Sequence, residues 1–356
     1  MGTFTNILAA EKQMRVGIHV GHWERAPADL TAVAQEAERA GFDSVWTSEA
    51  WGSDGLVLLT WIAAHTHRIA VGTGILQIPA RTPANVAMAA ITLDHLTGGR
   101  LRLGLGTSGP QVAEGWYGER FERPLERSDE YIRIVRAILQ RKDPVRFEGV
   151  HYRLPAVGGS GLGLPLKAEV VPLRADLPIY LAAMGPKNVS LAASVADGWL
   201  PLFYSPENRD IFEDGLERGF ESGGRSRENF DVSPVVPVAI GEDLDECRDA
   251  LRSTIARYIG GMGTRGANFY NSLVRRYGYE EAAERVQALF LDGKRAEAVA
   301  SVPDALVDEL SLAGPVQRVR ERLEVWAGAG VTTLLGRVRD ARTVRLLAEA
   351  AARHLA

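Results

Sequence analysis

The stretch RIAVGTGILQIPARTPANVAMAAITLDHLTGGRLRLGLG (68–106) decides the fold, because it contains a complete strand–helix–strand unit. Residues 69–74 form a short apolar run, which predicts a buried strand. Residues 83–96 predict a helix that begins at a proline and ends before Gly98-Gly99, and residues 101–105 predict a second strand. A strand, a helix and a strand in this order are typical of two parallel strands joined by a right-handed crossover.

The same alternation extends in both directions along the chain. The strands that we expect cover residues 16–20, 44–47, 69–74, 101–105, 179–182, 199–202, 232–240 and 332–335. The helices that we expect cover residues 30–40, 56–66, 83–96, 127–139, 187–196, 209–219 and 343–354. Eight strands alternating with helices predict an α/β fold of the (β/α)8 TIM-barrel type, with an open doubly wound sheet as the alternative.

Two segments interrupt this rhythm. The first, at about 140–176, is long and rich in glycine and proline, and the second, at about 257–307, is mostly helical and polar. Segments of this size within a compact domain are usually lids or binding loops. We therefore expect an N-terminal extension over residues 1–13 and a single barrel domain over 14–356 that carries both insertions.

The composition excludes several classes of protein. Hydrophobic residues make up 46% of the 356 residues and charged residues 24%, which is typical of a globular protein with a core. Because 41 Lys and Arg stand against 45 Asp and Glu, for a net charge of −4, we expect no nucleic-acid partner. No apolar run approaches the roughly 18 residues that cross a bilayer, so we expect no membrane partner. The N-terminus lacks the basic region of a secretory signal. The single cysteine, Cys247, excludes disulfides within the chain. We therefore expect the protein to be located in the cytoplasm.

In a barrel the functional site lies at the carboxyl ends of the strands. These ends are rich in glycine, small hydroxyl side chains and tryptophan, which suits a flat ring system that the backbone approaches closely. They contain no cluster of His, Asp or Glu at metal-ligand spacing, so we expect no metal.

Two glycine motifs follow predicted strands. Gly104-Leu105-Gly106-Thr107-Ser108-Gly109 fits the dinucleotide fingerprint G-x-G-x-x-G, but Pro110 and a polar, aromatic loop follow it, so the glycines more simply let a ligand lie against the strand end. Met184-Gly185-Pro186-Lys187-Asn188 places a glycine turn and a proline at a helix start, whose N–H groups favour a phosphate. An ordinary helix start is the alternative for this second motif.

The candidate catalytic residues are Glu49, His22 and Trp51, which follow the first two strands. Glu49 is an isolated carboxylate among small and apolar neighbours, so it suits a general acid or base, or a cofactor contact; the alternative is capping of the next helix. The alternative for His22 is a residue of the core or rim whose hydrogen bonds are made within the protein. The alternative for Trp51 and Trp116 is that their side chains pack in the core. We take Trp23 and Trp116 as candidate substrate contacts.

The chain resembles the luciferase-like monooxygenase superfamily, in its coenzyme F420-dependent oxidoreductase branch, from Met14 to Ala352. The resemblance rests on GFDSVWTSEAWGSDG (41–55), on the segment from 68 to 118, on GLGLPLK (161–167), on DLPIYLAAMGPKNVSLAASVADGWLP (176–201) and on YIGGMGTRGANFYN (258–271). It implies the barrel fold with an insertion, and a deazaflavin lying across the strand ends.

The resemblance also implies roles for individual residues. The third strand should end in a cis peptide, Gly74-Ile75, behind the ring, and Thr107 and Ser108 should line the cofactor. Glu49 falls where relatives place an acid near the ring, and the Met184–Asn188 segment where they hold the phosphate. Some dehydrogenase relatives have Asp-His after the second strand, whereas this chain has Glu49-Ala50, which argues against sugar-phosphate oxidation.

Three functions follow as hypotheses. The first is hydride exchange between the C5 atom of coenzyme F420 and a small organic substrate. The alternatives are an FMNH2-dependent monooxygenase, with FMN as its flavin, and a non-catalytic flavin-binding relative. In the 257–307 segment we expect Arg265, Asn268 and Tyr270 to line the site from a lid; the alternative is a solvated basic helix. We also expect a homodimer.

Overall fold

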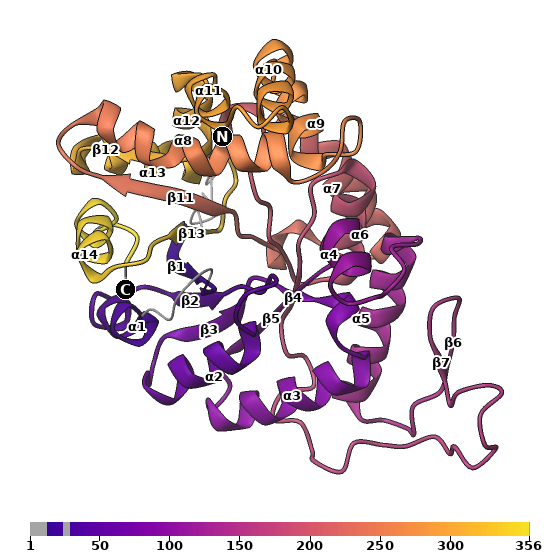
Figure 1. Cartoon of the computed structure of the whole chain (residues 1–356). Helices are drawn as coiled ribbons and strands as arrows, with labels where there is room; N and C mark the ends of the chain where they lie inside the picture. The colour runs from indigo at the N-terminus through magenta and orange to yellow at the C-terminus, as the bar shows by residue number, and fades with distance from the viewer. Residues whose placement is uncertain (1–12, 24–28, 356) are drawn as a thin grey trace, which may run out of the picture.

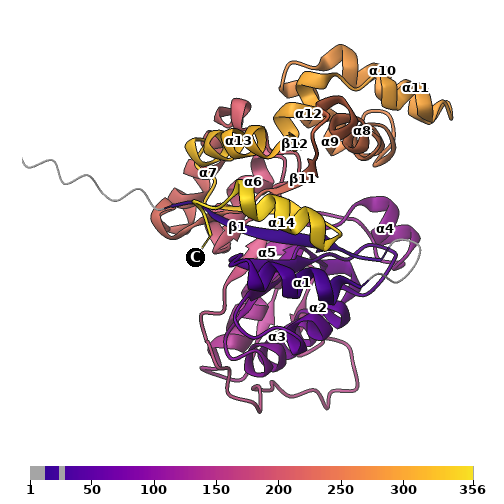
Figure 2. The same cartoon turned by 90° about the vertical axis from the view of Figure 1, so that its left-hand side faces the viewer.

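The computed structural model describes residues 13–23 and 29–355, so the predicted N-terminal extension lies almost entirely outside it. Its centre is a curled parallel sheet with helices packed around its outer face (Figures 1 and 2). The strands, in chain order, are β1 (Arg15–Gly21), β2 (Ser44–Thr47), β3 (Ala70–Thr73), β4 (Leu76–Gln77), β5 (Leu101–Gly106), β6 (Phe147–Glu148), β7 (Arg153–Leu154), β8 (Ile179–Leu181), β9 (Gly198–Trp199), β10 (Asp231–Val232), β11 (Val235–Ile240), β12 (Leu312–Gly314) and β13 (Thr333–Arg337).

The helices follow the strands as the sequence predicts, with additions. They are α1 (Leu30–Arg39), α2 (Gly55–Ala64), α3 (Pro83–Leu96), α4 (Pro110–Gly115), α5 (Pro124–Gln140), α6 (Pro186–Val195), α7 (Asp210–Gly223), α8 (Leu244–Gly261), α9 (Phe269–Arg276), α10 (Glu280–Leu291), α11 (Arg295–Ala300), α12 (Asp304–Leu310), α13 (Val316–Gly328) and α14 (Ala341–Ala350). Within the described ranges, no helix combines the length and the apolar character needed to cross a membrane.

The main sheet is entirely parallel and runs in the order β10–β9–β8–β5–β3–β2–β1–β13–β11–β12, with β4 beside β5. This order differs from that of a doubly wound dinucleotide-binding sheet, in which the strand order reverses at a switch point. Here the strands from β1 to β10 in the main sheet lie side by side in chain order. The fold is therefore α/β with a curled parallel half-barrel.

The predicted strand at 232–240 is divided into β10 and β11. Pro234 lies at the break, where it has no N–H to offer a neighbouring strand. The backbone of this region bonds on both sides: Ser233 N donates to Trp199 O at 2.8 Å, and Leu335 N donates to Pro234 O at 2.9 Å. The sequence analysis missed β12 and α13, and it assigned to a loop the residues that form α4.

Large rings fill the inside of the curl. Trp46 and Tyr180 are buried with Leu200 and Leu335, and the two rings meet edge to face with centroids 5.1 Å apart. Glycine is required beside the Trp46 ring, because a Cβ at Gly72 would lie 2.4 Å from it. At this level the inside of the curl is therefore filled by packed side chains.

Ion pairs close the amino end of the sheet. Asp231, at the start of β10, accepts hydrogen bonds from Arg15 Nη2 and from Tyr180 Oη, both at 2.8 Å, and from Thr333 Oγ1 at 2.9 Å. Arg102, at the start of β5, donates to Asp43 just before β2. These contacts lie at the amino ends of the strands, away from the carboxyl ends where parallel barrels place their functional sites.

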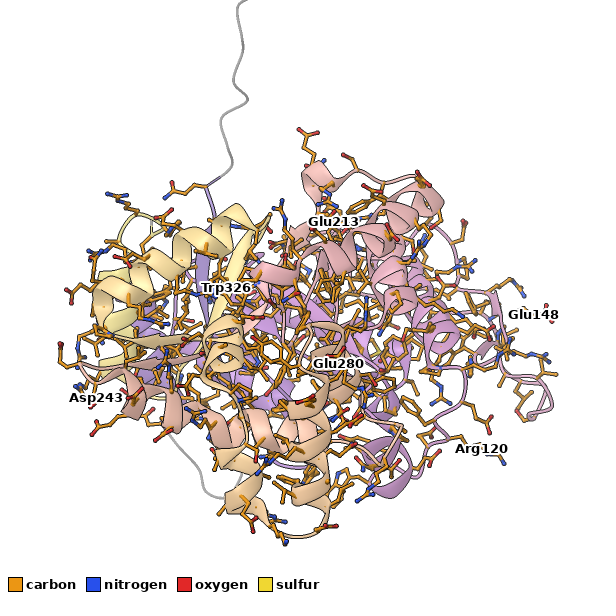
Figure 3. All side chains as sticks on the ribbon, turned by 90° about the horizontal axis from the view of Figure 1, so that it is seen from above. Arg120, Glu148, Glu213, Asp243, Glu280 and Trp326 are labelled. Carbon is orange, nitrogen blue, oxygen red and sulfur yellow. The ribbon has the colours of Figure 1, made fainter. Side chains whose placement is uncertain are left out.

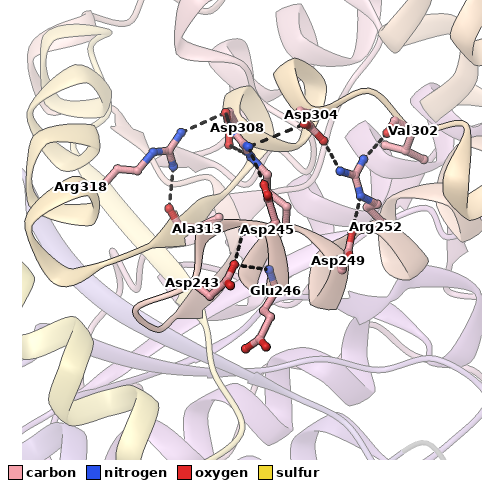
Figure 4. Close-up of polar contacts among 11 residues, drawn as sticks. Asp243, Asp245, Glu246, Asp249, Arg252, Val302, Asp304, Asp308, Ala313 and Arg318 are labelled. Atoms are coloured by element: carbon pink, nitrogen blue, oxygen red, sulfur yellow. Dashed lines mark hydrogen bonds and ion pairs between the residues drawn. The ribbon is translucent and has the colours of Figure 1, made fainter.

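Two excursions leave the sheet. Between α5 and β8 the chain forms the hairpin of β6 and β7 and then a long irregular segment that passes below α3 (Figure 1). Between β11 and β12 it forms α8 to α12, so this insertion begins before the predicted boundary at 257. Arg248 on α8 donates to both oxygens of Asp308 on α12, at 3.1 and 2.6 Å. Arg318 on α13 pairs with the same Asp308 carboxylate at 3.0 Å (Figure 4), so the three helices are fixed to one another.

Candidate active site

The cis peptide expected at Gly74-Ile75 is confirmed. It lies between β3 and β4, and the Gly74 carbonyl accepts a hydrogen bond from His19 Nε2 at 3.0 Å. Because a carbonyl only accepts, Nε2 carries the hydrogen of the ring. Burial, with the nearby positive charge of Arg337 as a second cause, lowers the pKa of His19 to about 4. His19 is therefore neutral, and the sequence analysis missed it.

The end of β5 passes close to Ile75. A Cβ at Gly106 would lie 2.9 Å from Ile75 Cδ1, so glycine is needed where the two segments meet. Thr107 and Ser108 follow, and Ser108 has a φ of 60°, a backbone conformation that residues other than glycine rarely adopt. Thr107 also lines a small hollow together with Arg120 and Arg127; Arg120 lies at the edge of the molecule (Figure 3).

Glu49 is held by the protein on both of its oxygens. Arg81 Nη1 and Nη2 donate to Oε2 and Oε1, each at 2.7 Å, Gln77 N donates to Oε2 at 3.1 Å, and Gly55 N donates to Oε1 at 3.3 Å. The hydrogen bond with Glu49 raises the pKa of the Arg81 guanidinium. This geometry favours a role in positioning the start of α2, and the catalytic role of Glu49 stays a prediction.

The residues at the end of β1 meet the loop after β2. His22 Nδ1 and Ser48 Oγ share a hydrogen bond of 3.0 Å, and Trp23 N donates to Ser53 Oγ at 3.0 Å. Trp51 in the same loop is 51% exposed, so it is not a packing residue within the chain. Trp116, after α4, is 64% exposed, which likewise argues against packing.

The phosphate motif forms the start of α6 as the sequence predicts. Gly185 is the residue before the helix, Pro186 is its first residue, and no side chain within the described ranges caps it. Lys187 is exposed, and Met184 packs partly against the core. Asn188 donates to Ala182 O at 3.4 Å, and its Oδ1 is buried without a hydrogen-bond partner among the described residues.

The predicted lid residues do not form one surface. Asn268 is buried: its Nδ2 donates to Tyr258 O and Ile259 O at 3.0 and 2.9 Å, and its Oδ1 accepts from Tyr270 N and Asn271 N. Its side chain therefore caps α9, and the structure gives no support to its binding role. Arg265 is exposed and lies 3.8 Å from Asp292.

Tyr270 belongs to an aromatic cluster that the sequence analysis missed. Its ring lies 4.7 Å from that of Tyr258 and 5.4 Å from that of Phe203, the latter just after β9. Tyr277 Oη donates to Phe203 O at 2.7 Å, which ties the end of α9 to the segment after β9. Among the residues described, no group of three or more His, Cys, Asp or Glu is arranged to hold a metal ion.

The sequence matches the family model described as luciferase-like monooxygenase over residues 8–333. The chain therefore belongs to the luciferase-like monooxygenase family. The expected resemblance to this family is confirmed.

Individual relatives narrow the comparison. The chain is 46% identical, over 95% of its length and 99% of the relative's, to a Mycobacterium tuberculosis protein whose name places it among the coenzyme F420-dependent oxidoreductases. It is 28% identical to the 5,10-methylenetetrahydromethanopterin reductase of Archaeoglobus fulgidus, over 86% and 88% of the two chains. The solved coenzyme F420-dependent tetrahydromethanopterin reductase of Methanopyrus kandleri superimposes with a TM-score of 0.81 at 23% identity, over 97% of this chain and 100% of that one, which shows the shared fold.

Proposed function

We propose that the protein is a coenzyme F420-dependent oxidoreductase that exchanges a hydride with a small organic substrate. The observation that carries this proposal is the 46% identity, over nearly the whole of both chains, to the mycobacterial relative named for this cofactor. A relative named as an F420-dependent glucose-6-phosphate dehydrogenase, 31% identical over 255 residues, supports it.

The residues at the carboxyl ends of the strands fit such a cofactor. The uncapped start of α6 offers backbone N–H groups and the charge of Lys187 to a phosphate. The buried Oδ1 of Asn188 has no hydrogen-bond partner in the described structure and is suited to accept from a ligand hydroxyl. Gly106 and Ile75 meet closely enough to form a flat floor for a ring.

We assign the remaining work to the chain's own side chains. The cofactor, when bound, supplies or accepts a hydride, so the protein must orient the substrate and move a proton. His22 is suited to the proton, because the Ser48 hydroxyl fixes its ring through Nδ1. The exposed indoles of Trp51 and Trp116 are suited to cover a ring and exclude water.

Anaerobic titration with F420 and with FMN, followed by absorbance, tests this proposal. We expect saturable binding of F420 that Lys187→Gln weakens by about tenfold, the scale of one charge-assisted hydrogen bond. Lys142→Gln, a matched change at an exposed lysine just after α5, should have no effect. Preferred binding of FMN, with oxygen uptake by the FMNH2-loaded protein, would instead establish the monooxygenase alternative. Binding of F420 without turnover of any substrate would establish the non-catalytic alternative.

We also propose that the half-barrel closes into a (β/α)8 barrel of the luciferase-like type. Residues 231–235 bond to 197–201 on one side and to 332–335 on the other, which supports closure through this divided strand. The Ser233 and Thr332 amides join β10 to β9 on one side and to the start of β13 on the other, so we expect both to be as strongly protected from hydrogen exchange as the β1 amides; fast exchange of either would argue for an open sheet.

We propose a homodimer in the cytoplasm. An exposed apolar face on α2 and α3 supports the dimer: Val57 is 70% exposed, Trp61 60%, Met88 64% and Leu96 72%. Sedimentation should give the mass of two chains for the native protein and of one chain for the double variant Trp61→Glu/Met88→Glu. The single cysteine is typical of a reducing compartment, and cell fractionation tests this location.

A further inference from the structure

The motif GLGLPLK (161–167) carries exposed leucines that no part of the candidate site uses. Leu162, Leu164 and Leu166 are 83%, 76% and 78% exposed, in a stretch without helix or strand. No charged residue stands between Pro155 and Leu166. Single exposed apolar side chains are ordinary, but three of them so close together form a surface that favours a partner over water. We call Leu162, Leu164 and Leu166 the apolar row.

The outer helices α2 and α3 lack the charged face that a surface helix usually turns to water. Helix α2 has no Asp, Glu, Lys or Arg over Gly55–Ala64, and the one acid of α3, Asp94, is buried and bonds to Arg174 at 3.0 Å. Other outer helices keep exposed charges, such as Arg133 on α5 and Glu321 on α13. Depletion of charge is typical of the core of a protein interface. The apolar helix face consists of four side chains that are each more than half exposed: Val57, Trp61, Met88 and Leu96.

The segment that carries the apolar row continues along the end of α3. His95 Nε2, on the last turn of α3, donates to Val171 O at 2.8 Å, and Arg174 Nη2 donates to Leu101 O at 2.7 Å. Figures 1 and 2 both show the chain between β7 and β8 running beside α3. The apolar row and the apolar helix face are therefore joined by further exposed apolar side chains, those of Val170, Val171 and Leu173.

The apolar area on this side of the molecule is enough for one half of an interface. A fully exposed Val, Leu or Met side chain presents about 60–120 Å² and Trp more, so these side chains together present roughly 500–800 Å². A standard interface covers about 800 Å² per partner, of which about 60% is apolar. The largest apolar patch of an ordinary monomer measures about 300–600 Å². These side chains therefore supply the apolar part of one standard interface.

A second copy of this chain covers both surfaces at once. Within one chain neither surface covers the other, because both are exposed in the part of the chain that the structure describes. In a two-fold symmetric dimer every contact occurs twice with the roles exchanged. Two unlike surfaces on one side of a chain are then covered together, in both copies.

We propose that the apolar row of each copy packs on the apolar helix face of its partner. This inference rests on the homodimer proposed above, and it assigns the GLGLPLK segment to the interface and not to the active site. Val145, just beyond the end of α5, donates to Leu166 O at 2.8 Å, and in an alternating α/β fold the helices end on the side where the strands begin. The apolar row therefore lies away from the carboxyl ends of the strands.

Sedimentation equilibrium of the full chain at several concentrations tests the interface. Each buried leucine is worth about tenfold or more in an association constant, so Leu162→Ser/Leu164→Ser should raise the dissociation constant of the dimer by at least about 100-fold. The matched control is Phe269→Ser/Leu291→Ser, which changes two exposed apolar residues on α9 and α10. It should change this constant by no more than about threefold, as expected away from the interface. Circular dichroism checks that both variants fold.

Cross-linking identifies the surface that the apolar row meets. One chain carries Leu164→Cys and a differently tagged chain carries Met88→Cys, while the native thiol of Cys247 is buried. When the two chains are expressed together, we expect a short bis-maleimide to link them. The same reagent should not link Leu164→Cys to Val325→Cys, a change at an exposed position on α13.

The outcomes separate this inference from the proposals on which it rests. A native dimer that the row variant and the control weaken equally, or that gives no link between the Leu164→Cys and Met88→Cys chains, would refute the apolar row and leave the homodimer standing. A native monomer would refute both, and row-dependent binding of that monomer to vesicles of phosphatidylethanolamine and phosphatidylglycerol would assign the surface to lipid. F420 titration of the row variant should give the native affinity, and a weakened affinity would return the segment to the active site. A row-dependent dimer that does not bind F420 would support the interface and refute the proposed activity.

Discussion

Replacing Arg81 by methionine tests whether Glu49 is held by the protein or serves the reaction. The two side chains are 14% and 3% exposed and share two hydrogen bonds of 2.7 Å. Removal of one partner from a buried pair leaves an uncompensated charge, which costs about 3–5 kcal/mol. Asp54 also loses its contact with the guanidinium, but its 44% exposure makes that term small.

Urea unfolding followed by circular dichroism measures this loss. We expect Arg81→Met to lower the free energy of unfolding by about 3 kcal/mol or more. Glu49→Gln keeps the shape and should cost about 1–2 kcal/mol, and the double variant should lose less than the sum, because both changes remove one interaction. If Arg81→Met lay within about 0.5 kcal/mol of the native protein, the positioning role would be refuted.

Turnover of the F420-loaded enzyme gives the second measurement. If Glu49 only positions α2, Glu49→Gln should retain most of the activity. A loss of about 10²-fold or more with unchanged stability would instead establish the catalytic role that the sequence predicts.

Three further changes have defined outcomes. The pKa of His19 is about 4 in the folded protein against 6.5 in the unfolded chain, so its contribution to stability is present above pH 6.5 and is lost as the pH falls towards 4. The free energy of unfolding, measured in urea at several pH values in this range, should therefore depend less steeply on pH in His19→Gln than in the native protein. An unchanged dependence on pH would contradict the neutral ring. Asp231→Ala leaves the buried Tyr180 hydroxyl without its partner, whereas Arg15 is 41% exposed and stays 3.6 Å from Asp43, so the free energy of unfolding should fall by about 1–3 kcal/mol, a loss that calorimetry detects and that a shift below about 0.5 kcal/mol would rule out. Asn268→Ala removes the cap of α9 and should cost about 1–2 kcal/mol, with faster hydrogen exchange in that helix; weaker F420 binding at unchanged stability would restore its predicted place in the site.

The sequence predicts the sheet well, because its strands are short apolar runs bounded by glycines. Residues 44–47 are strand β2 as expected, and residues 83–96 are helix α3. The prediction of strands failed where the local sequence pattern and the pairing of the strands in the folded sheet disagree. The predicted strand at 232–240, which contains Ser233 and two prolines, is divided at Pro234, and β12 is too short, at three residues, to be distinguished from a loop.

The candidate site is predicted in part. The cis peptide follows from the resemblance to the family, and the start of α6 follows from a local glycine–proline motif; the structure contains both. His19 and Arg81 were missed because their importance comes from partners 55 and 32 residues away. The sequence does contain one signal for His19. It lies two residues before Gly21, the last residue of β1, so the two residues lie on the same face of the strand, near its carboxyl end.

The divided pairing of β11 bears on how this architecture changes during evolution. Residues 235–237 pair with β13, whereas residues 238–240 pair with β12, so the chain leaves for the α8–α12 excursion and returns from it on two strands bonded side by side. Material inserted between two anchored, adjacent backbone segments leaves the spacing of the remaining strands unchanged. Selection is thus free to lengthen, shorten or replace the α8–α12 segment while the parallel sheet is inherited intact, so this segment can be exchanged as a module without redesigning the core.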